Sequence, residues 1–127
     1  MSIQLDKIRV LIVDDSEFVT RKLQDILEKA NMDVVAVGRN GIDALRFFKE
    51  YNPDIITMDI NMPDMDGLSA LKLIHQINPE AKVIILSSMS SREKVIDAMR
   101  EGAKGFITKP FVSEKVVAII TKTHYKG

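Results

Sequence analysis

The sequence predicts an α/β fold, in which a doubly wound, five-stranded parallel sheet in the order 2-1-3-4-5 is covered by five helices. Five short apolar runs, rich in β-branched residues, alternate along the chain with helix-length segments. Apolar runs of this kind, which lack a period-2 alternation of apolar and polar residues, are typical of strands that are buried on both faces. Strict alternation with short connections requires right-handed crossovers, which place helices on both faces of a parallel sheet. The 127 residues are the size of one domain, so we expect a single domain over residues 1–127 with its core at about 8–122.

The strands are expected where the apolar runs lie. In chain order, the runs are Ile8–Val13, Met32–Val37, Ile55–Met58, Val83–Leu86 and Phe106–Thr108. The second strand, which ends at Val37-Gly38, is expected at the outer edge of the sheet.

The helices are expected where apolar residues recur at a spacing near 3.6, between residues that start or stop helices. The first, third and fourth helices carry the stripes Val19-Leu23-Ile26-Leu27-Ala30, Leu71-Ile74-Ile77 and Val95-Ile96-Met99. The fourth helix is expected to open with a capping box, in which Ser90 and Glu93 satisfy free backbone amides. Asn40-Gly41 and Ser113 mark the starts of the second and fifth helices, and Pro53, Pro79 and Gly102 mark helix ends.

The composition excludes several classes of protein. There is no cysteine, which removes disulfides, thiolate metal sites and cysteine nucleophiles. Eighteen basic residues balance eighteen acidic ones, so net charge gives no reason to expect nucleic-acid binding. The longest apolar run covers only residues 116–120, far short of a membrane span or a signal sequence. We therefore expect a soluble, cytoplasmic protein that does not insert into membranes.

Polar residues follow four of the five strands, at the point where each strand ends. They are Asp14-Asp15-Ser16, Asp59 with Asn61 two residues later, Ser87-Ser88 and Lys109-Pro110. The second strand contributes nothing comparable. In an open parallel sheet of this flavodoxin-like order, ligands bind at the carboxyl ends of the strands where the order reverses, between strands 1 and 3. We therefore expect these side chains to meet in one crevice.

The chemistry of this set points to phosphoryl transfer. Taken singly, each residue also fits an ordinary role, such as a helix N-cap for the acidic pair or a solvated lysine for Lys109. Together, three carboxylates repel one another unless a cation joins them, and hard oxygen ligands favour Mg²⁺, with Mn²⁺ as an alternative. The ammonium of Lys109 and the hydroxyl of Ser87 can stabilise phosphoryl oxygens. Asp59 is the natural nucleophile, because carboxylates form aspartyl-phosphates.

These residues resemble the receiver domain of two-component response regulators. The resemblance runs from Ile8 to about Ile120 and includes Met62-Pro-Asp-Met-Asp-Gly67, which follows the central acid. The other matching stretches are Val10-Leu-Ile-Val-Asp-Asp-Ser16, Pro53-Asp-Ile-Ile-Thr-Met-Asp59, Ser87 and Lys109-Pro110.

The resemblance implies a role for each matching position. Asp59 is the expected phosphoacceptor, Asp14 and Asp15 hold Mg²⁺ with Asp59 and the backbone carbonyl of Asn61, and Lys109 contacts the phosphoryl group. The bond from Lys109 to Pro110 is often cis in this family. Ser87 and Phe106 correspond to the switch residues that respond to phosphorylation. Asn61 and Met89 lie where side chains flank the path of an attacking water, and the apolar Met89 cannot orient that water, which predicts slow or moderate self-dephosphorylation.

The resemblance also implies partners. A sensor histidine kinase is the expected phosphodonor, and a downstream protein is expected on the face formed by the fourth helix, the fifth strand and the fifth helix. The stretch from Thr57 to Pro63 is most similar to chemotaxis-type regulators, which act on a flagellar motor. A phosphorelay intermediate and a receiver cut from a transcriptional regulator remain open alternatives.

An enzyme acting on an external substrate is the more distant alternative. A phosphatase of the haloacid dehalogenase type needs a second aspartate two residues after its nucleophile, and Asn61 occupies that position here. A receiver-like binding module without phosphorylation is expected to lack one of the acids or the lysine, and this sequence has them all. We therefore expect a protein that catalyses only its own phosphorylation and dephosphorylation.

Overall fold

The computed structural model describes residues 6–126 and has the predicted architecture. The five strands form one parallel sheet in the order β2-β1-β3-β4-β5. The elements in chain order are β1 (Arg9–Val13), α1 (Glu17–Lys29), β2 (Asp33–Gly38), α2 (Gly41–Tyr51), β3 (Ile55–Asp59), α3 (Gly67–Ile77), β4 (Val83–Ser88), α4 (Arg92–Arg100), β5 (Gly105–Lys109) and α5 (Ser113–Lys126). In this part of the chain, no helix combines the length and the apolar character that crossing a membrane demands.

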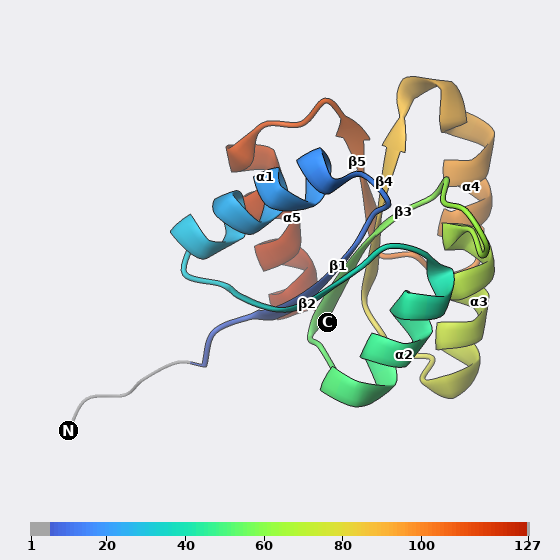
Figure 1. Ribbon diagram of the computed structural model, residues 1–127, viewed down its shortest axis with the longest axis horizontal. Helices are drawn as coiled ribbons and strands as arrows, with labels where there is room; N and C mark the ends of the chain where they lie inside the picture. Colours follow the sequence, from blue (N-terminus) through green and yellow to red (C-terminus); the bar gives the residue numbers. More distant parts are fainter. Residues whose placement is uncertain (1–5, 127) are drawn as a thin grey trace.

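The sheet separates two apolar cores. Helices α1 and α5 cover one face, and α2, α3 and α4 cover the other (Figure 1). Along β1, Val10 and Ile12 belong to the core under α1 and α5, whereas Leu11 and Val13 belong to the core under α2, α3 and α4. The central strands are therefore buried on both faces, as their continuous apolar runs predict.

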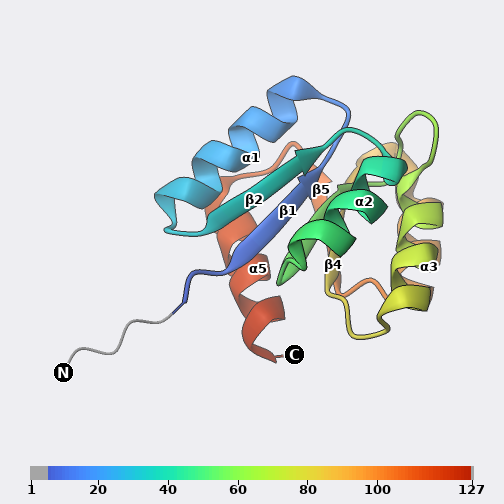
Figure 2. The same ribbon diagram turned by 60° about the horizontal axis from the view of Figure 1, so that its bottom comes forward.

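The two edge strands differ from the central ones. In β2, most residues are only half-buried, and β2 lies at the open edge of the sheet beside β1 (Figure 2). In β5, Gly105 and Ile107 are buried, while the side chain of Phe106 remains 49% exposed. The apolar run at residues 106–108 thus forms the predicted strand, but one face of that strand is open.

Several helices begin with side-chain caps just beyond the carboxyl edge of the sheet, one of them at the predicted start Asn40. The Ser16 hydroxyl accepts a hydrogen bond from the Val19 backbone N–H at 3.2 Å, and the Asn40 side chain accepts one from Asp43 at 2.8 Å. Asp66 caps α3 in the same way. At the other end of α4, Gly102 has φ +101°, a left-handed conformation that glycine adopts without strain.

The predicted capping box at the start of α4 is wrong. A short 3₁₀ turn (Met89–Ser91) precedes the helix, which begins at Arg92 with Ser91 as its N-cap and without a side-chain cap. The hydroxyl of Ser90 lies 2.8 Å from that of Ser88. The extra turn displaces Ser90 from the capping position, so its spacing to Glu93 does not form the motif.

Candidate functional site

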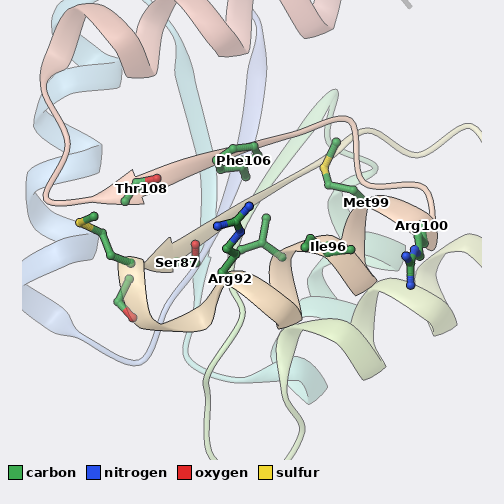
Figure 3. A pocket seen from close by; sticks show the side chains of 10 residues that line it. Ser87, Arg92, Ile96, Met99, Arg100, Phe106 and Thr108 are labelled. Atoms are coloured by element: carbon green, nitrogen blue, oxygen red, sulfur yellow. The ribbon is translucent and has the colours of Figure 1, made fainter.

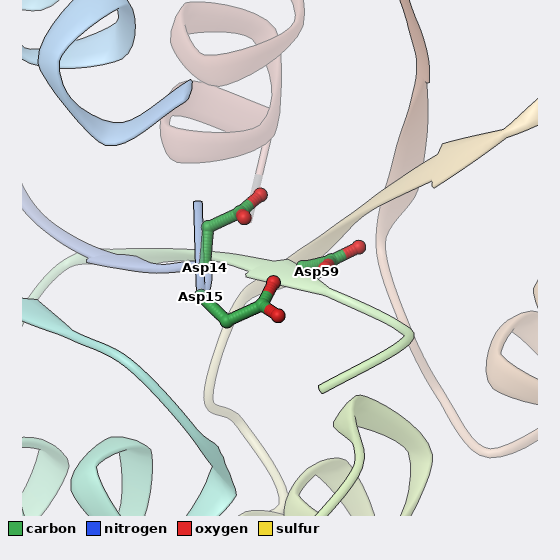
Figure 4. A group of neighbouring side chains, drawn as sticks. All are labelled: Asp14, Asp15 and Asp59. Carbon is green, nitrogen blue, oxygen red and sulfur yellow. The ribbon is translucent and has the colours of Figure 1, made fainter. Parts of the chain in front are cut away.

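Three carboxylates gather at the carboxyl ends of the two neighbouring strands β1 and β3. Asp14 and Asp15 directly follow β1, and Asp59 is the last residue of β3 (Figure 4). One carboxylate oxygen from each residue lies within 4.8 Å of the others. Asp14 and Asp59 are buried, whereas Asp15 is exposed. The predicted acidic cluster is therefore present, and Asp15 is its solvent-exposed member.

Lys109 brings a positive charge into this group from the end of β5. Its Nζ lies 2.8 Å from Asp14 Oδ2 and 3.3 Å from Asp59 Oδ1. The Lys109–Pro110 peptide bond is cis, as the resemblance implies. The structure thus places the predicted lysine against both buried acids.

The electrostatics of the crevice change two titrating groups. Burial and the neighbouring Asp14 charge raise the pKa of Asp59 from its ordinary value near 3.8 to about 6, although Lys109 and the Asn61 backbone N–H partly oppose the rise. Burial lowers the pKa of Lys109, but its hydrogen bond to Asp14 and the charges of Asp59 and Asp14 outweigh this, so the net shift is upward. Lys109 is therefore held in its charged form, while Asp59 keeps its proton up to a higher pH than an ordinary aspartate does.

Backbone contacts hold the first acid in place. The Ser16 backbone N–H donates to Asp14 Oδ1 at 2.9 Å, and the Asp14 backbone N–H donates to the Gly38 carbonyl at 3.1 Å. Because Oδ2 faces Lys109, both carboxylate oxygens of Asp14 have a partner. This leaves the Asp14 side chain little freedom to turn away from the crevice.

Close backbone packing positions the loop after Asp59. The Gly67 backbone N–H donates to the Ile60 carbonyl at 3.1 Å. A Cβ atom at position 67 would lie only 2.3 Å from the Asp59 carbonyl oxygen. The glycine of the Met62–Gly67 motif is therefore needed because the start of α3 touches the backbone of the acidic residue itself.

Two of the remaining predicted residues, Ser87 and Phe106, lie on the β4–β5 side. Ser87 is buried and follows Leu86, the register partner of Asp59. Ser87 is paired across the sheet with Thr108, and Phe106 lies two residues earlier on the same strand. Asn61 follows Asp59 by two residues, and its side chain turns toward α4.

Arg39 was not among the residues expected at this edge. Arg39 follows β2, and its guanidinium donates to Thr20 Oγ1 at 2.9 Å and approaches the Asp14 backbone carbonyl at 3.5 Å. It therefore joins the end of β2 to the first turns of α1, beside the acidic pair. The sequence feature that could have pointed to Arg39 is its position, as a basic residue directly after a predicted parallel strand.

The family model for the response regulator receiver domain matches residues 10–121. The chain belongs to this family. This receiver domain is 49% identical to the chemotaxis protein CheY of Bacillus subtilis, in an alignment that covers 91% of this chain and 96% of the relative. It is 47% identical to the CheY of Thermotoga maritima, with 90% and 95% covered.

Solved structures agree with this assignment. The response regulator domain of Thermotoga maritima CheB matches with a TM-score of 0.82 and 39% identity, over 95% of this chain and 96% of that one. A chain in the CheX–CheY–BeF₃–Mg²⁺ complex from Borrelia burgdorferi matches with a TM-score of 0.85 and 35% identity, covering 90% of this chain and 87% of its own. The predicted family and fold are thus confirmed, and the family is one of signalling domains.

Proposed function

We propose that this receiver domain accepts a phosphoryl group on Asp59 from a phosphohistidine of a sensor kinase and then signals by altered protein binding in chemotaxis. The observation that carries the proposal is the contact of Lys109 Nζ with Asp14 and Asp59 beside a third carboxylate. An acidic group that needs a cation, next to a fixed ammonium, suits a phosphoryl group and its metal. The similarity to CheY proteins supports the chemotactic role.

The donor set fits Mg²⁺. Two of the three carboxylates are buried, and Lys109 alone does not balance their charge. Asp14, Asp15 and Asp59 would hold the ion, with the Asn61 backbone carbonyl as a further ligand. When bound, Mg²⁺ supplies positive charge to the carboxylates and to the phosphoryl oxygens.

The chemical step uses a carboxylate oxygen of Asp59 as the nucleophile. A bond forms from this oxygen to phosphorus while the bond from phosphorus to the donor imidazole nitrogen breaks, and the electron pair leaves with the imidazole. Lys109 stabilises the oxygens of the transferred group, because its ammonium is held beside Asp59. The Ser87 hydroxyl, one residue past the register partner of Asp59, is the group that can donate to a phosphoryl oxygen once it arrives.

The output face is proposed on α4, β5 and α5. A pocket of about 650 Å³ lies between α4 and β5, and Phe106, Thr108, Ile96 and Met99 line it (Figure 3). Ser87 lines the same pocket from β4. Movement of Ser87 toward a phosphoryl group would therefore change the floor against which the Phe106 ring can turn, and the exposed shape of this face would change with it.

Intact mass spectrometry tests the acceptor. After incubation with acetyl phosphate and Mg²⁺, the wild type should gain the mass of one phosphoryl group, and chelation of the metal should prevent the gain. Asp59→Asn should gain nothing, whereas Asp64→Asn should behave as the wild type. Asp64 is a suitable control because it is exposed and has φ +66°, which asparagine tolerates.

A second phosphodonor makes a negative result interpretable. If acetyl phosphate fails, the same proteins are incubated with a phosphorylated histidine kinase. Absence of an adduct with both donors, while Mg²⁺ still binds, would contradict the proposed function and favour a binding module without phosphorylation.

Fluorine NMR tests the switch. In protein labelled with fluorophenylalanine, the Phe106 resonance, assigned through Phe106→Leu, should shift when BeF₃⁻ and Mg²⁺ are added. The shift should be absent in Asp59→Asn. An unchanged Phe106 resonance in a protein that does bind BeF₃⁻ would contradict the role of this residue while leaving the acceptor intact.

A further inference from the structure

The side chain of Asn61 is fastened to the start of α4. Its Oδ1 accepts a hydrogen bond from Lys94 Nζ at 2.5 Å, and its Nδ2 donates to the Ser91 hydroxyl at 3.0 Å. Both ends of the amide are therefore engaged by residues about thirty positions away in the chain. At the same time, the backbone N–H of Asn61 bonds to the Asp59 carboxylate. One residue thus joins the acidic site to α4.

Lys94 lies at a position in α4 that is unfavourable for a cation. Arg92 and Lys94 both lie in the first turn of α4, at the positive end of the helix dipole, where cations are unfavourable. A helix can retain such a residue when a tertiary contact compensates for it. Here the ammonium reaches out of the helix to the loop that carries Asn61.

Ser91 is positioned by the same helix start. It is buried, and its hydroxyl accepts from Asn61 while a second serine hydroxyl, that of Ser88, lies 3.4 Å away. The Ser91 hydroxyl therefore has a partner on each side, and its lone pair is directed to Asn61. The 3₁₀ turn that replaces the expected capping box makes this possible, because it turns Ser91 inward.

The direction of the amide matters for hydrolysis of an aspartyl-phosphate. In that reaction, a water oxygen bonds to phosphorus and the bond from phosphorus to Asp59 breaks, with its electron pair passing to the carboxylate. A proton of the water passes to the phosphate product or to solvent. A carboxamide two residues from Asp59 can orient this water only if it points toward the phosphorus. The contacts with Lys94 and Ser91 point it toward α4 instead.

We propose that Lys94 and Ser91 are positioning residues that hold the Asn61 amide on α4 and so prolong the lifetime of a phosphoryl group on Asp59. This inference rests on the proposed function, because it concerns the product of that reaction. A positioning role and an electrostatic role for Lys94 predict opposite effects on the rate of phosphate loss. An ammonium that stabilised the charge developing during hydrolysis would speed the reaction, so its removal would slow it.

The test is a double-mutant cycle on the rate of phosphate loss. Wild type, Lys94→Met, Asn61→Ala and the double variant are phosphorylated with acetyl phosphate and Mg²⁺ and then freed of the donor. The decay of the adduct is followed by intact mass. Methionine removes the ammonium of Lys94 and keeps most of its length. Lys94→Met should speed decay by about threefold to tenfold, the range expected for losing one solvent-exposed hydrogen bond of ordinary net strength.

The double variant separates the two roles of Lys94. If Lys94 acts through Asn61, Lys94→Met should change the rate by less than about twofold when alanine is already present at position 61. Lys72→Met, which removes an exposed lysine from α3, controls for net charge and should decay as the wild type. The Asn61 side-chain amide signals in a ¹⁵N–¹H spectrum should also shift in Lys94→Met and stay unchanged in Lys72→Met.

The results of these experiments distinguish the positioning role of Lys94 from the phosphorylation of Asp59 on which it depends. Slower decay in Lys94→Met, or an equal change with and without Asn61, would overturn the positioning role while the adduct itself upheld the acceptor. No adduct on the wild type with either donor would overturn both. Ser91→Ala gives an independent check, because it removes the other contact without altering charge and should also speed decay.

Discussion

Asp59 shows how one residue can be placed at a cost to the fold. Its carboxylate is buried beside Asp14, and the result is a pKa of about 6 in place of 3.8. An acid whose pKa is raised on folding binds its proton more tightly in the native state than in the unfolded state. Its contribution to stability is therefore fully present below about pH 4 and is lost as the pH rises through about 6. The acid that is needed as a nucleophile is, in the absence of a cation, a source of instability at neutral pH.

The substitution Asp59→Asn should therefore stabilise the metal-free protein at neutral pH. The expected gain at pH 7 is about 1–3 kcal/mol in the free energy of unfolding, because a shift of one pKa unit corresponds to about 1.4 kcal/mol. The gain should shrink toward zero as the pH falls to 4, where the wild-type carboxyl is protonated. Urea unfolding in EDTA at several pH values measures it.

The control for this prediction is Asp64→Asn, which removes an exposed carboxylate from the same loop. Its effect on stability should be small and should not vary between pH 4 and pH 7. An Asp59→Asn protein that is less stable than the wild type at pH 7 would mean that the ion contacts of Lys109 outweigh the cost of burying the charge.

At the scale of elements, the start of α3 and the end of β3 share one tightly packed turn. A Cβ at Gly67 would meet the Asp59 carbonyl oxygen at 2.3 Å and the Ile60 Cα at 2.9 Å, and both are backbone atoms that cannot rotate away. Gly67→Ala should therefore cost about 2–4 kcal/mol, around the upper end of the usual range for overpacking. It should also weaken Mg²⁺ binding, because the backbone that must yield is that of Asp59. Thermal unfolding and titration calorimetry measure the two effects.

Gly105→Ala is the matched control for this turn. A Cβ at Gly105 would meet the terminal methyl of Ile119 at 2.9 Å, and a side-chain end can turn aside. The cost should be below about 1 kcal/mol, with Mg²⁺ affinity unchanged. Equal costs for the two alanine variants would argue against the tight β3–α3 turn as the feature that fixes Asp59.

Local sequence patterns predicted the elements well where neighbours in sequence decide the structure. The helix start at Asn40, the glycine after α4 and the buried central strands follow from nearby residues. The start of α4 does not, because its N-cap residue Ser91 is engaged by Asn61, which lies 30 residues away. The exposed face of β5 was also missed, because an apolar run does not reveal how far the flanking helices extend over it.

The same distinction applies to the site. The four charged residues Asp14, Asp15, Asp59 and Lys109 were predicted because fold topology brings strand ends together. Arg39 and Lys94 were not, because their roles depend on long side chains that reach across 19 and 33 residues to Thr20 and Asn61. No periodicity or cap signals such contacts, and only the packed structure reveals them.

At the scale of the molecule, both cores depend on the same three central strands. Alternate residues of β1 enter opposite cores, and β3 and β4 contribute to both as well. Loss of either core would expose strands that the other core needs, which favours unfolding in one cooperative step. A cation that binds the acids at the end of β1 and β3 should therefore stabilise the whole domain and not only its edge.

Mg²⁺ should thus raise the unfolding temperature of the wild type as a single transition. A ligand that binds only the folded state adds about 2.7 kcal/mol when its concentration is one hundred times the dissociation constant. For a domain of this size, that corresponds to a shift on the order of 10 °C. Circular dichroism should give the same midpoint at far- and near-ultraviolet wavelengths in each condition, once without the ion and once, at the higher temperature, with it.

Asp59→Asn should show a smaller shift in unfolding temperature, because it removes one of the three carboxylates. Lowering the pH from 7 to 5 should reduce the wild-type shift as Asp59 takes up its proton. NaCl at equal ionic strength controls for screening, and a shift of the same size with NaCl, or one that Asp59→Asn retains in full, would show that the stabilisation does not arise from an ion bound at this site.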